Sequence, residues 1–379
     1  MEHKTIFQSA EIKAIFLPGA SDFLLITFAP VQFDSGVEPF WGARLAAKLG
    51  LSAIGFVSCT GTNWYPRIDM EMAAAEILET TSNFKKIITY GSSMGAYGAL
   101  KYSALLNATS CAAFGPQFSI DPKDIGDPQF TRYFRNEIHE NMSIQGNEVC
   151  HNAYIFFDPH FKFDQDNAHF IGRGASHANL IKIPFAGHEW VKVFANAKAI
   201  LALFNSCLVG ETVEILKLTR IARSQSSARN VGLAQHLIPR NYKMALRVLE
   251  LSPTPLDKKQ EANFYDYAAV AEIKSGNLDQ AEIYAIKSLE LLPTRASFLR
   301  RLGNIYDRKK QFSLAIDCFN RSLSIDAKDS ASYFNLASIF FHRNENEEAM
   351  NSIMKAIDLV PDEPRYLQLL KRIYAVWKR

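Results

Sequence analysis

The stretch YGSSMGAYGAL, residues 90–100, follows the short apolar and β-branched run FKKIIT and precedes a helix-like run. Gly91 and Gly95 stand two residues before and two residues after Ser93, which gives the pattern G-x-S-x-G. In this pattern the serine occupies a strained turn between a strand and a helix, and its neighbours are small because larger side chains would clash there. Ser92 lacks the flanking glycines, so the pattern selects Ser93.

Short apolar runs alternate with helical patterns up to about residue 208. This alternation predicts a mostly parallel sheet with helices on both faces. The five-residue linker PGASD, residues 18–22, predicts an antiparallel hairpin between the first two strands at one edge. The polar, irregular residues 117–150 are expected to form an insertion above the sheet. The expected strands are EIKAIFL, DFLLITFA, SAIGFVS, KKIITY, SCAAFG, AYIFFD and LIKIPF.

Two later strands end in residues that could act with Ser93. AYIFFDP ends at Asp158, and LIKIPFAGHEW passes through a glycine turn to His188 and an amphipathic helix. A serine, an acid and a histidine in this order, each at the carboxyl end of a predicted strand, resemble the α/β-hydrolase superfamily over residues 10–207.

The resemblance implies a role for each of the three residues. Ser93 would be the nucleophile, His188 the general base and then the acid, and Asp158 the carboxylate that orients the imidazole. Asp164 and Asp166 are alternative acids, but Asp158 directly follows its strand. No cofactor and no metal are expected.

The resemblance also implies two backbone N–H donors for an oxyanion. One comes from the residue after the nucleophile, Met94, and the other from the loop TFAPVQF. The HGG motif common in the superfamily is absent before the first helix, and Pro30 has no N–H. Ala29 and Val31 are therefore both candidates for the second donor.

Composition and charge narrow the class of protein. The chain has 379 residues, a net charge of +3 and five scattered cysteines without CxxC pairs. These cysteines argue for free thiols rather than disulfides or a zinc site. Without a signal-peptide core or an apolar run long enough to span a bilayer, a cytoplasmic protein is expected. Basic residues are in excess over 211–260, but no basic–aromatic motif accompanies them, so nucleic-acid binding is not expected.

Several other residues near the candidate site have simpler explanations. A cluster of histidines lacks the i,i+4 spacing of helical metal ligands, and a surface or turn role is expected for it. Aromatic residues near the site are expected in the core, with pocket lining as the alternative. These residues are His151, His160, His169 and His177, and Trp64, Tyr65 and Phe185.

A different period begins after Gly210. Ala281, Ala315 and Ala349 are spaced 34 residues apart, and small and large residues recur around them. This pattern resembles the tetratricopeptide repeat (TPR), in which the helices of one repeat nest against each other. We therefore expect an all-α TPR solenoid of three repeats plus a capping helix over 262–379.

The predicted organisation is thus an α/β-hydrolase-like domain over 1–209, a helical connector over 210–261 containing a degenerate repeat, and the solenoid. The predicted function is a serine hydrolase or acyltransferase with an ester substrate, such as an acetylated glycan or glycoprotein, and the repeats would recruit a protein or peptide. The alternative is a TPR scaffold protein whose hydrolase-like domain is inactive.

Overall fold

The computed structural model describes residues 3–125, 128–188, 193–194, 196–251, 256 and 258–377. Contacts divide the chain into two compact units, Met1–Arg229 and Asn230–Arg379. The predicted connector is therefore shared between them. Parts of the insertion (126–127) and of the helix predicted after His188 (189–192 and 195) lie outside the described residues.

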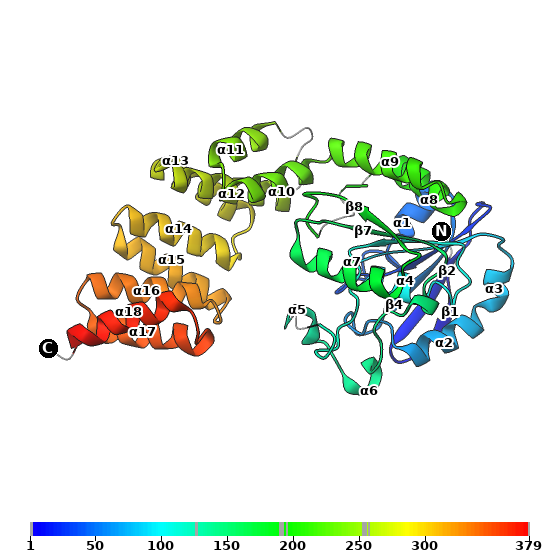
Figure 1. Ribbon diagram of the computed structural model, residues 1–379, viewed down its shortest axis with the longest axis horizontal. Helices are drawn as coiled ribbons and strands as arrows, with labels where there is room; N and C mark the ends of the chain where they lie inside the picture. The colour runs from blue at the N-terminus through cyan, green and yellow to red at the C-terminus, as the bar shows by residue number, and fades with distance from the viewer. Residues whose placement is uncertain are drawn as a thin grey trace. The chain divides into compact units, whose positions relative to one another are not determined.

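The first unit is built on a mixed sheet (Figure 1). Within the described residues it has eight strands in the order β1-β2-β4-β3-β5-β6-β7-β8. Neighbours from β4 to β8 are parallel, whereas β2 is antiparallel to both β1 and β4. In the order of the sheet, the strands are β1 (Lys4–Gln8), β2 (Ile12–Leu17), β4 (Ser52–Ser58), β3 (Leu24–Phe28), β5 (Ile87–Ser92), β6 (Ser110–Phe114), β7 (Asn152–Phe157) and β8 (Asn179–Lys182).

The predicted hairpin between β2 and β3 is wrong, because β4 lies between these two strands. Their linker instead passes over the start of β4. There the backbone N–H of Gly19 donates to the Ser52 hydroxyl at 3.2 Å, and the N–H of Ala20 donates to the carbonyl of Gly50 at 2.8 Å. The antiparallel partner of β2 at the edge is β1, a strand that the sequence analysis missed.

Helices cover both faces of the sheet and bury two separate apolar clusters. Helices α2 (Arg67–Glu76), α4 (Met94–Lys101) and α7 (Lys162–Gly174) cover one face, and the short helix α3 (Leu78–Ser82) follows α2. The other face is covered by α1 (Ala43–Leu49), α8 (Ala197–Val209) and α9 (Thr212–Gln225). Ile215 of α9 is fully buried there, so the first part of the predicted connector belongs to this unit.

The predicted insertion is attached to the core of the first unit by polar contacts. It contains α5 (Pro128–Thr131), α6 (Asn136–His139) and the 3₁₀ turn Gly146–Glu148. The buried Lys101 ammonium binds the Glu148 carboxylate at 2.8 Å, and the Tyr97 hydroxyl donates to the carbonyl of Met142 at 2.5 Å. These contacts hold the insertion against α4.

The second unit is all-helical within its described residues, and consecutive antiparallel helices stack along it (Figure 1). Ala281, Ala315 and Ala349 are fully buried, as the 34-residue spacing predicts. At Gly303 a Cβ would lie 2.7 Å from the Phe319 ring, so a glycine lets the two helices of one pair approach closely. The helices are α10 (Ser227–Leu237), α11 (Tyr242–Glu250), α12 (Lys258–Ser275), α13 (Leu278–Leu291), α14 (Ala296–Arg308), α15 (Phe312–Ile325), α16 (Ser330–His342), α17 (Asn346–Leu359) and α18 (Pro364–Trp377).

Candidate functional site

Ser93 occupies the turn between β5 and α4, with φ 55° and ψ −123°. This is a positive-φ conformation that residues with side chains rarely adopt, and such strain costs on the order of 1–3 kcal/mol. The backbone N–H of Ser93 donates to the carbonyl of Phe114 in β6 at 2.9 Å, which ties the turn to the neighbouring strand. The strained turn keeps the Ser93 side chain at the carboxyl edge of the sheet.

The two glycines of the pattern are required by backbone packing. A Cβ on Gly91 would lie 2.0 Å from the carbonyl oxygen of Gly95, and a Cβ on Gly95 would lie 2.1 Å from the carbonyl oxygen of Phe28. Both obstacles are backbone atoms, which cannot rotate away as a side chain can. The turn therefore closes only with glycine at both positions, and the end of β3 lies against the start of α4.

His188 connects Ser93 to a carboxylate. Its Nε2 lies 3.0 Å from the Ser93 Oγ, and its Nδ1 lies 2.7 Å from the Oδ1 of Asp164. An ionised carboxylate only accepts hydrogen bonds, so Nδ1 carries the proton of the neutral ring and Nε2 is left as an acceptor for the serine hydroxyl. Proton transfer from Ser93 to His188 is therefore possible in this geometry.

The prediction that Asp158 contacts the imidazole is wrong; the alternative, Asp164, does so. The Asp158 Oδ1 accepts the N–H of His160 and its Oδ2 accepts the N–H of Gly187, both at 2.9 Å. Asp158 thus fixes the two loops beside His188. The other alternative, Asp166, faces outward and pairs with Lys162.

Burial shifts the pKa of the Asp164 carboxylate. Its side chain is completely buried in the first turn of α7, and this burial raises its pKa, while the hydrogen bond and the charge of His188 lower it. The net effect is a pKa above the ordinary value of 3.8. Burial penalises the charged form of Asp164, and the contact with His188 offsets part of that penalty.

Two of the backbone N–H groups predicted as oxyanion donors are free within the described residues. Neither Met94, the first residue of α4, nor Val31, in the loop after β3, donates a hydrogen bond there. Ala29 is excluded as a donor because its N–H already donates to the carbonyl of Phe56 at 3.0 Å. Of the two candidates for the second donor, only Val31 is left.

Aromatic side chains line the surroundings of His188. The ring centroids of Phe161 and Phe163 each lie 6.0 Å from the imidazole centroid. Phe163 also packs on Phe130 of the insertion at 4.9 Å, and Phe130 packs edge-on to Trp64 at 5.9 Å. The insertion therefore contributes to an apolar wall beside the histidine.

The other aromatic residues considered from the sequence have structural contacts. Trp64 and Tyr65 are fully buried, and the Tyr65 hydroxyl donates to the carbonyl of Ala29 at 2.6 Å, which holds the chain just before Val31. Phe185 stacks on His160 with centroids 4.2 Å apart.

The remaining histidines of the cluster also make ring contacts. His151 and His177 stack on each other at 6.0 Å, and His169 lies edge-on to Phe157 at 6.2 Å. No group of three potential metal ligands occurs among the residues that the structure describes.

One polar residue at this site was not predicted from the sequence. The Nε2 of Gln117 lies 3.2 Å from the Ser93 Oγ, and Gln117 is completely buried. Its place shortly after β6 was the available signal, because β6 pairs with β5 in parallel and the carboxyl ends of the two strands meet at one edge.

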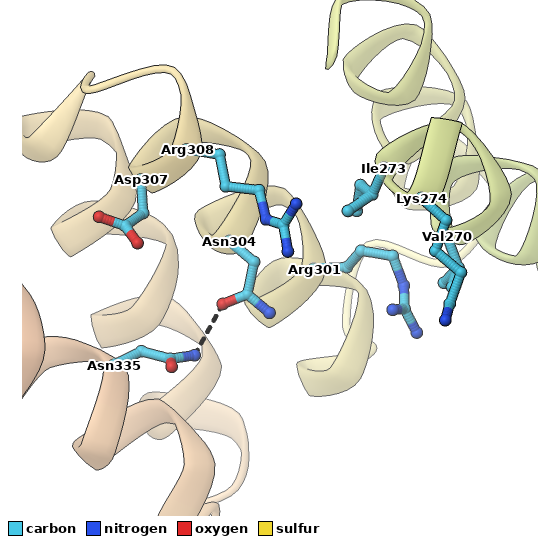
Figure 2. A pocket seen from close by; sticks show the side chains of 8 residues that line it. All are labelled: Val270, Ile273, Lys274, Arg301, Asn304, Asp307, Arg308 and Asn335. Carbon is cyan, nitrogen blue, oxygen red and sulfur yellow. Dashed lines mark hydrogen bonds between the residues drawn. The ribbon is translucent and has the colours of Figure 1, made fainter. Parts of the chain in front are cut away.

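A second candidate site lies in the helical unit. A cavity of about 430 Å³ is lined by residues of α12, α14 and α16 (Figure 2). The Nδ2 of Asn335 donates to the Oδ1 of Asn304 at 2.7 Å, and Arg301 forms a bidentate ion pair with Asp266. The full lining is Val270, Ile273, Lys274, Arg301, Asn304, Asp307, Arg308 and Asn335.

The charges of this cavity are predominantly positive. Lys274 and Arg308 form no ion pair with any other described residue. The one lining carboxylate, Asp307, has its pKa raised by burial, with the neighbouring cations opposing that rise. The cavity is therefore suited to an anionic group.

Residues 297–329 and 330–363 match the family model of the tetratricopeptide repeat. These segments are tetratricopeptide repeats. They correspond to the pairs α14–α15 and α16–α17, whose buried anchors are Ala315 and Ala349. The prediction of TPR repeats in the C-terminal region is confirmed. Repeats of this family typically bind proteins or peptides.

Known proteins with similarity to the chain include anaphase-promoting complex subunit 3 of Schizosaccharomyces pombe (strain 972 / ATCC 24843), 26% identical over 130 residues. The match covers 33% of this chain and 20% of that relative, so the chain spans about a fifth of its length. Similar solved structures include MamA 41-end from Desulfovibrio magneticus RS-1, 22% identical, with a TM-score of 0.35 and coverage of 40% of this chain and 85% of that one. YrrB, titled a TPR protein with an unusual peptide-binding site, is 17% identical, with a TM-score of 0.34 and coverage of 46% and 90%.

No helix among the described residues is long and apolar enough to cross a membrane.

Proposed function

We propose that the first unit is a serine hydrolase or acyltransferase of the α/β-hydrolase type. The observation that carries this proposal is the hydrogen-bonded series Ser93–His188–Asp164, with its serine on a strained strand-to-helix turn. The combination places a hydroxyl next to a base, and the base next to a buried carboxylate, which is the arrangement that activates a serine for nucleophilic attack.

The chemistry follows from these contacts. The Ser93 Oγ attacks the carbonyl carbon of an ester or thioester while its proton passes to the His188 Nε2. The carbonyl oxygen becomes an oxyanion that the N–H groups of Met94 and Val31 stabilise. The leaving group takes the proton from His188, and an acyl-enzyme forms. Water or an acceptor hydroxyl then attacks this ester, His188 takes its proton, and Ser93 departs with that proton restored.

The substrate is an acyl ester, with acetylated glycans and glycoproteins as the class suggested by analogy with the superfamily. The aromatic residues Phe161 and Phe163 beside His188 support an apolar environment for the acyl carbons. Such an environment excludes water and strengthens the electrostatic interactions in the site.

The repeats bring this chemistry to a protein or peptide partner. Lys274 and Arg308 favour a partner with acidic groups at the cavity of the second unit, and the Asn304–Asn335 amide pair has further polar atoms for a peptide backbone. A direct test measures binding of a fluorescent peptide rich in Asp and Glu to the full chain. The double variant Lys274→Ala/Arg308→Ala should weaken it, whereas exposed Lys371→Ala should not. Equal binding by all three proteins would contradict this role of the cavity.

The hydrolase proposal is tested by turnover of p-nitrophenyl esters of increasing acyl length. Wild type and Ser92→Ala should release p-nitrophenol, and Ser93→Ala should be reduced to the background rate. A folded wild-type protein that turns over no ester of the series, with or without an added acceptor alcohol, would favour the alternative of a TPR scaffold with an inactive domain.

A further inference from the structure

The side chain of Gln117 lies between an indole and the candidate nucleophile. Its Oε1 lies 3.3 Å from the Nε1 of Trp64, and its Nε2 lies 3.2 Å from the Ser93 Oγ. Nε2 also lies 3.5 Å from the carbonyl oxygen of Gly115. Gln117 and Trp64 are both completely buried. A buried amide that touches the reactive oxygen of the site requires an explanation, because burying a polar group is costly unless it is hydrogen-bonded.

The partners of the amide determine which end faces Ser93. The indole of Trp64 is a donor only, so it must face the amide oxygen. The carbonyl of Gly115 is an acceptor only, so it must face the amide nitrogen. The N–H₂ group therefore points at the Ser93 Oγ and donates to it. The single hydroxyl hydrogen of Ser93 is then left for the Nε2 of His188, at 3.0 Å.

Both sides of this arrangement are held in place. Trp64 packs against two aromatic rings of the insertion. Its ring centroid lies 5.9 Å from that of Phe130 and 5.5 Å from that of Tyr133. The residue after Gln117, Phe118, donates its N–H to the Oδ1 of buried Asn167 at 2.7 Å. Asn167 belongs to α7, the helix that also carries Asp164. The loop of Gln117 and the acid are thus fixed by one helix.

The sheet order separates the loop of Gln117 from the loop of Val31. Val31 follows β3, Ser93 follows β5 and Gln117 follows β6, and these strands are neighbours in that order. The loops that carry Val31 and Gln117 therefore follow strands on opposite sides of β5. Gln117 is placed to act on the nucleophilic oxygen itself, whereas the oxyanion forms on the carbonyl oxygen of the substrate.

We propose that Gln117 is a further catalytic residue, whose amide donates to the Ser93 Oγ and is oriented by Trp64. The inference rests on the proposed hydrolase function. As the hydroxyl proton passes to His188, negative charge grows on Oγ and the hydrogen bond from Gln117 strengthens. When the acyl-enzyme breaks down, the bond between the acyl carbon and Oγ breaks, and Oγ takes a proton from His188. The same amide stabilises the departing oxygen in that step.

The test measures how fast a fluorophosphonate modifies Ser93 in the full chain. In this reaction Oγ attacks phosphorus, fluoride leaves and the hydroxyl proton passes to His188, so the rate reports the reactivity of Oγ without an assumed substrate. Gln117→Met keeps the bulk and removes the donor. We expect its second-order labelling rate to fall about 10- to 100-fold, the range for one hydrogen bond to a charged group. Gln260→Met, an equally conservative change of a buried glutamine in the second unit, should leave the rate unchanged.

Trp64→Phe provides a second, independent variant. It removes the indole N–H and frees the amide to turn, so labelling should slow in the same direction as in Gln117→Met. Combined with Gln117→Met it should have no further effect, because two changes in one chain of interactions are not additive. Thermal unfolding of each variant checks that it is folded. Should Gln117→Met not fold, the rate of Trp64→Phe decides.

The outcomes separate the two proposals. If wild type is labelled and a folded Gln117→Met protein is labelled equally fast, the role of Gln117 is overturned and the proposed function stands. If both single variants slow labelling but the effects add fully, Gln117 acts on Ser93 without being oriented by Trp64, which overturns that part of the proposal. A folded wild-type protein that is not labelled overturns the proposed function, and the role of Gln117 with it.

Discussion

The Oδ1 of Asp164 lies 2.7 Å from the Nδ1 of His188, 24 residues further along the chain. Asp158 accepts the backbone N–H of Gly187, the residue next to that histidine, at 2.9 Å. The two aspartates therefore act on the same loop in different ways. Asp164 contacts the imidazole, and Asp158 fixes the backbone that carries it.

This division predicts unequal effects of two matched substitutions. Asp164→Asn should lower kcat for ester hydrolysis by about 10⁴-fold, the loss seen when an amide replaces the acid of a serine protease triad and favours the wrong tautomer. Asp158→Asn should lower kcat by only about 10-fold, since it disturbs one of the two backbone contacts of residue 158 but leaves the acid in place. Steady-state kinetics of both variants measure the difference. A larger loss in Asp158→Asn would show that Asp158 is the acid.

Asp164 should also make the stability of the wild-type protein depend on pH. Burial raises its pKa above the ordinary 3.8, so the folded state holds the proton more tightly than the unfolded state does. Stability from this group is therefore fully present below pH 3.8 and is lost as the pH rises through the raised pKa. Asp164→Asn should melt at a higher temperature than wild type near pH 7, and the gap should narrow toward pH 4. If the difference in melting temperature between Asp164→Asn and wild type grew as the pH fell, the predicted direction of the effect would be wrong.

The strained turn predicts a strong effect of one methyl group. A Cβ at Gly91 would lie 2.0 Å from the carbonyl oxygen of Gly95, so Gly91→Ala should destabilise the first unit by about 3 kcal/mol or more. Gly174 in α7 offers a control, since its Cβ would meet its nearest atom, the carbonyl oxygen of Ile144, at 3.6 Å. Gly174→Ala should change stability by about 1 kcal/mol or less. Urea unfolding compares the two, and a mild effect of Gly91→Ala would rule out the tight turn.

The position of α9 predicts where the chain can be shortened. Ile215 and Ala222 of α9 are buried in the apolar cluster of the first unit. A chain ending at residue 229 should therefore fold and keep ester turnover, whereas one ending at 210 should lose about 2 kcal/mol or more of stability, the value of burying one large aliphatic side chain. Unfolding curves and turnover of the two chains test this. Equal stability of both would mean that α9 contributes nothing to the first unit.

The sequence located most of the strands and the turn at Ser93, because these follow from local patterns. The alternation of apolar strands and helices located β5 and β7, and the glycine spacing located the turn at Ser93. The 34-residue period located the helix pairs of the second unit, since each pair must bury the same small residues against its neighbour.

Choosing between Asp158 and Asp164 required contacts that are distant in sequence. Asp158 directly follows β7, which ends at Phe157, but backbone N–H groups of two loops occupy both of its oxygens. Asp164 reaches His188 because α7 begins at Lys162 and turns its first buried carboxylate inward. Gln117 was missed for a similar reason, since no local pattern marks a single glutamine after a strand.

The central claim is that Ser93 is an activated nucleophile, and covalent labelling with a fluorophosphonate followed by peptide mass mapping tests it most directly. We predict one modification per chain, located on Ser93, retained in Ser92→Ala and absent from Ser93→Ala. A folded wild-type protein that stays unmodified, or a label that persists on another residue when Ser93 is replaced, would contradict the account.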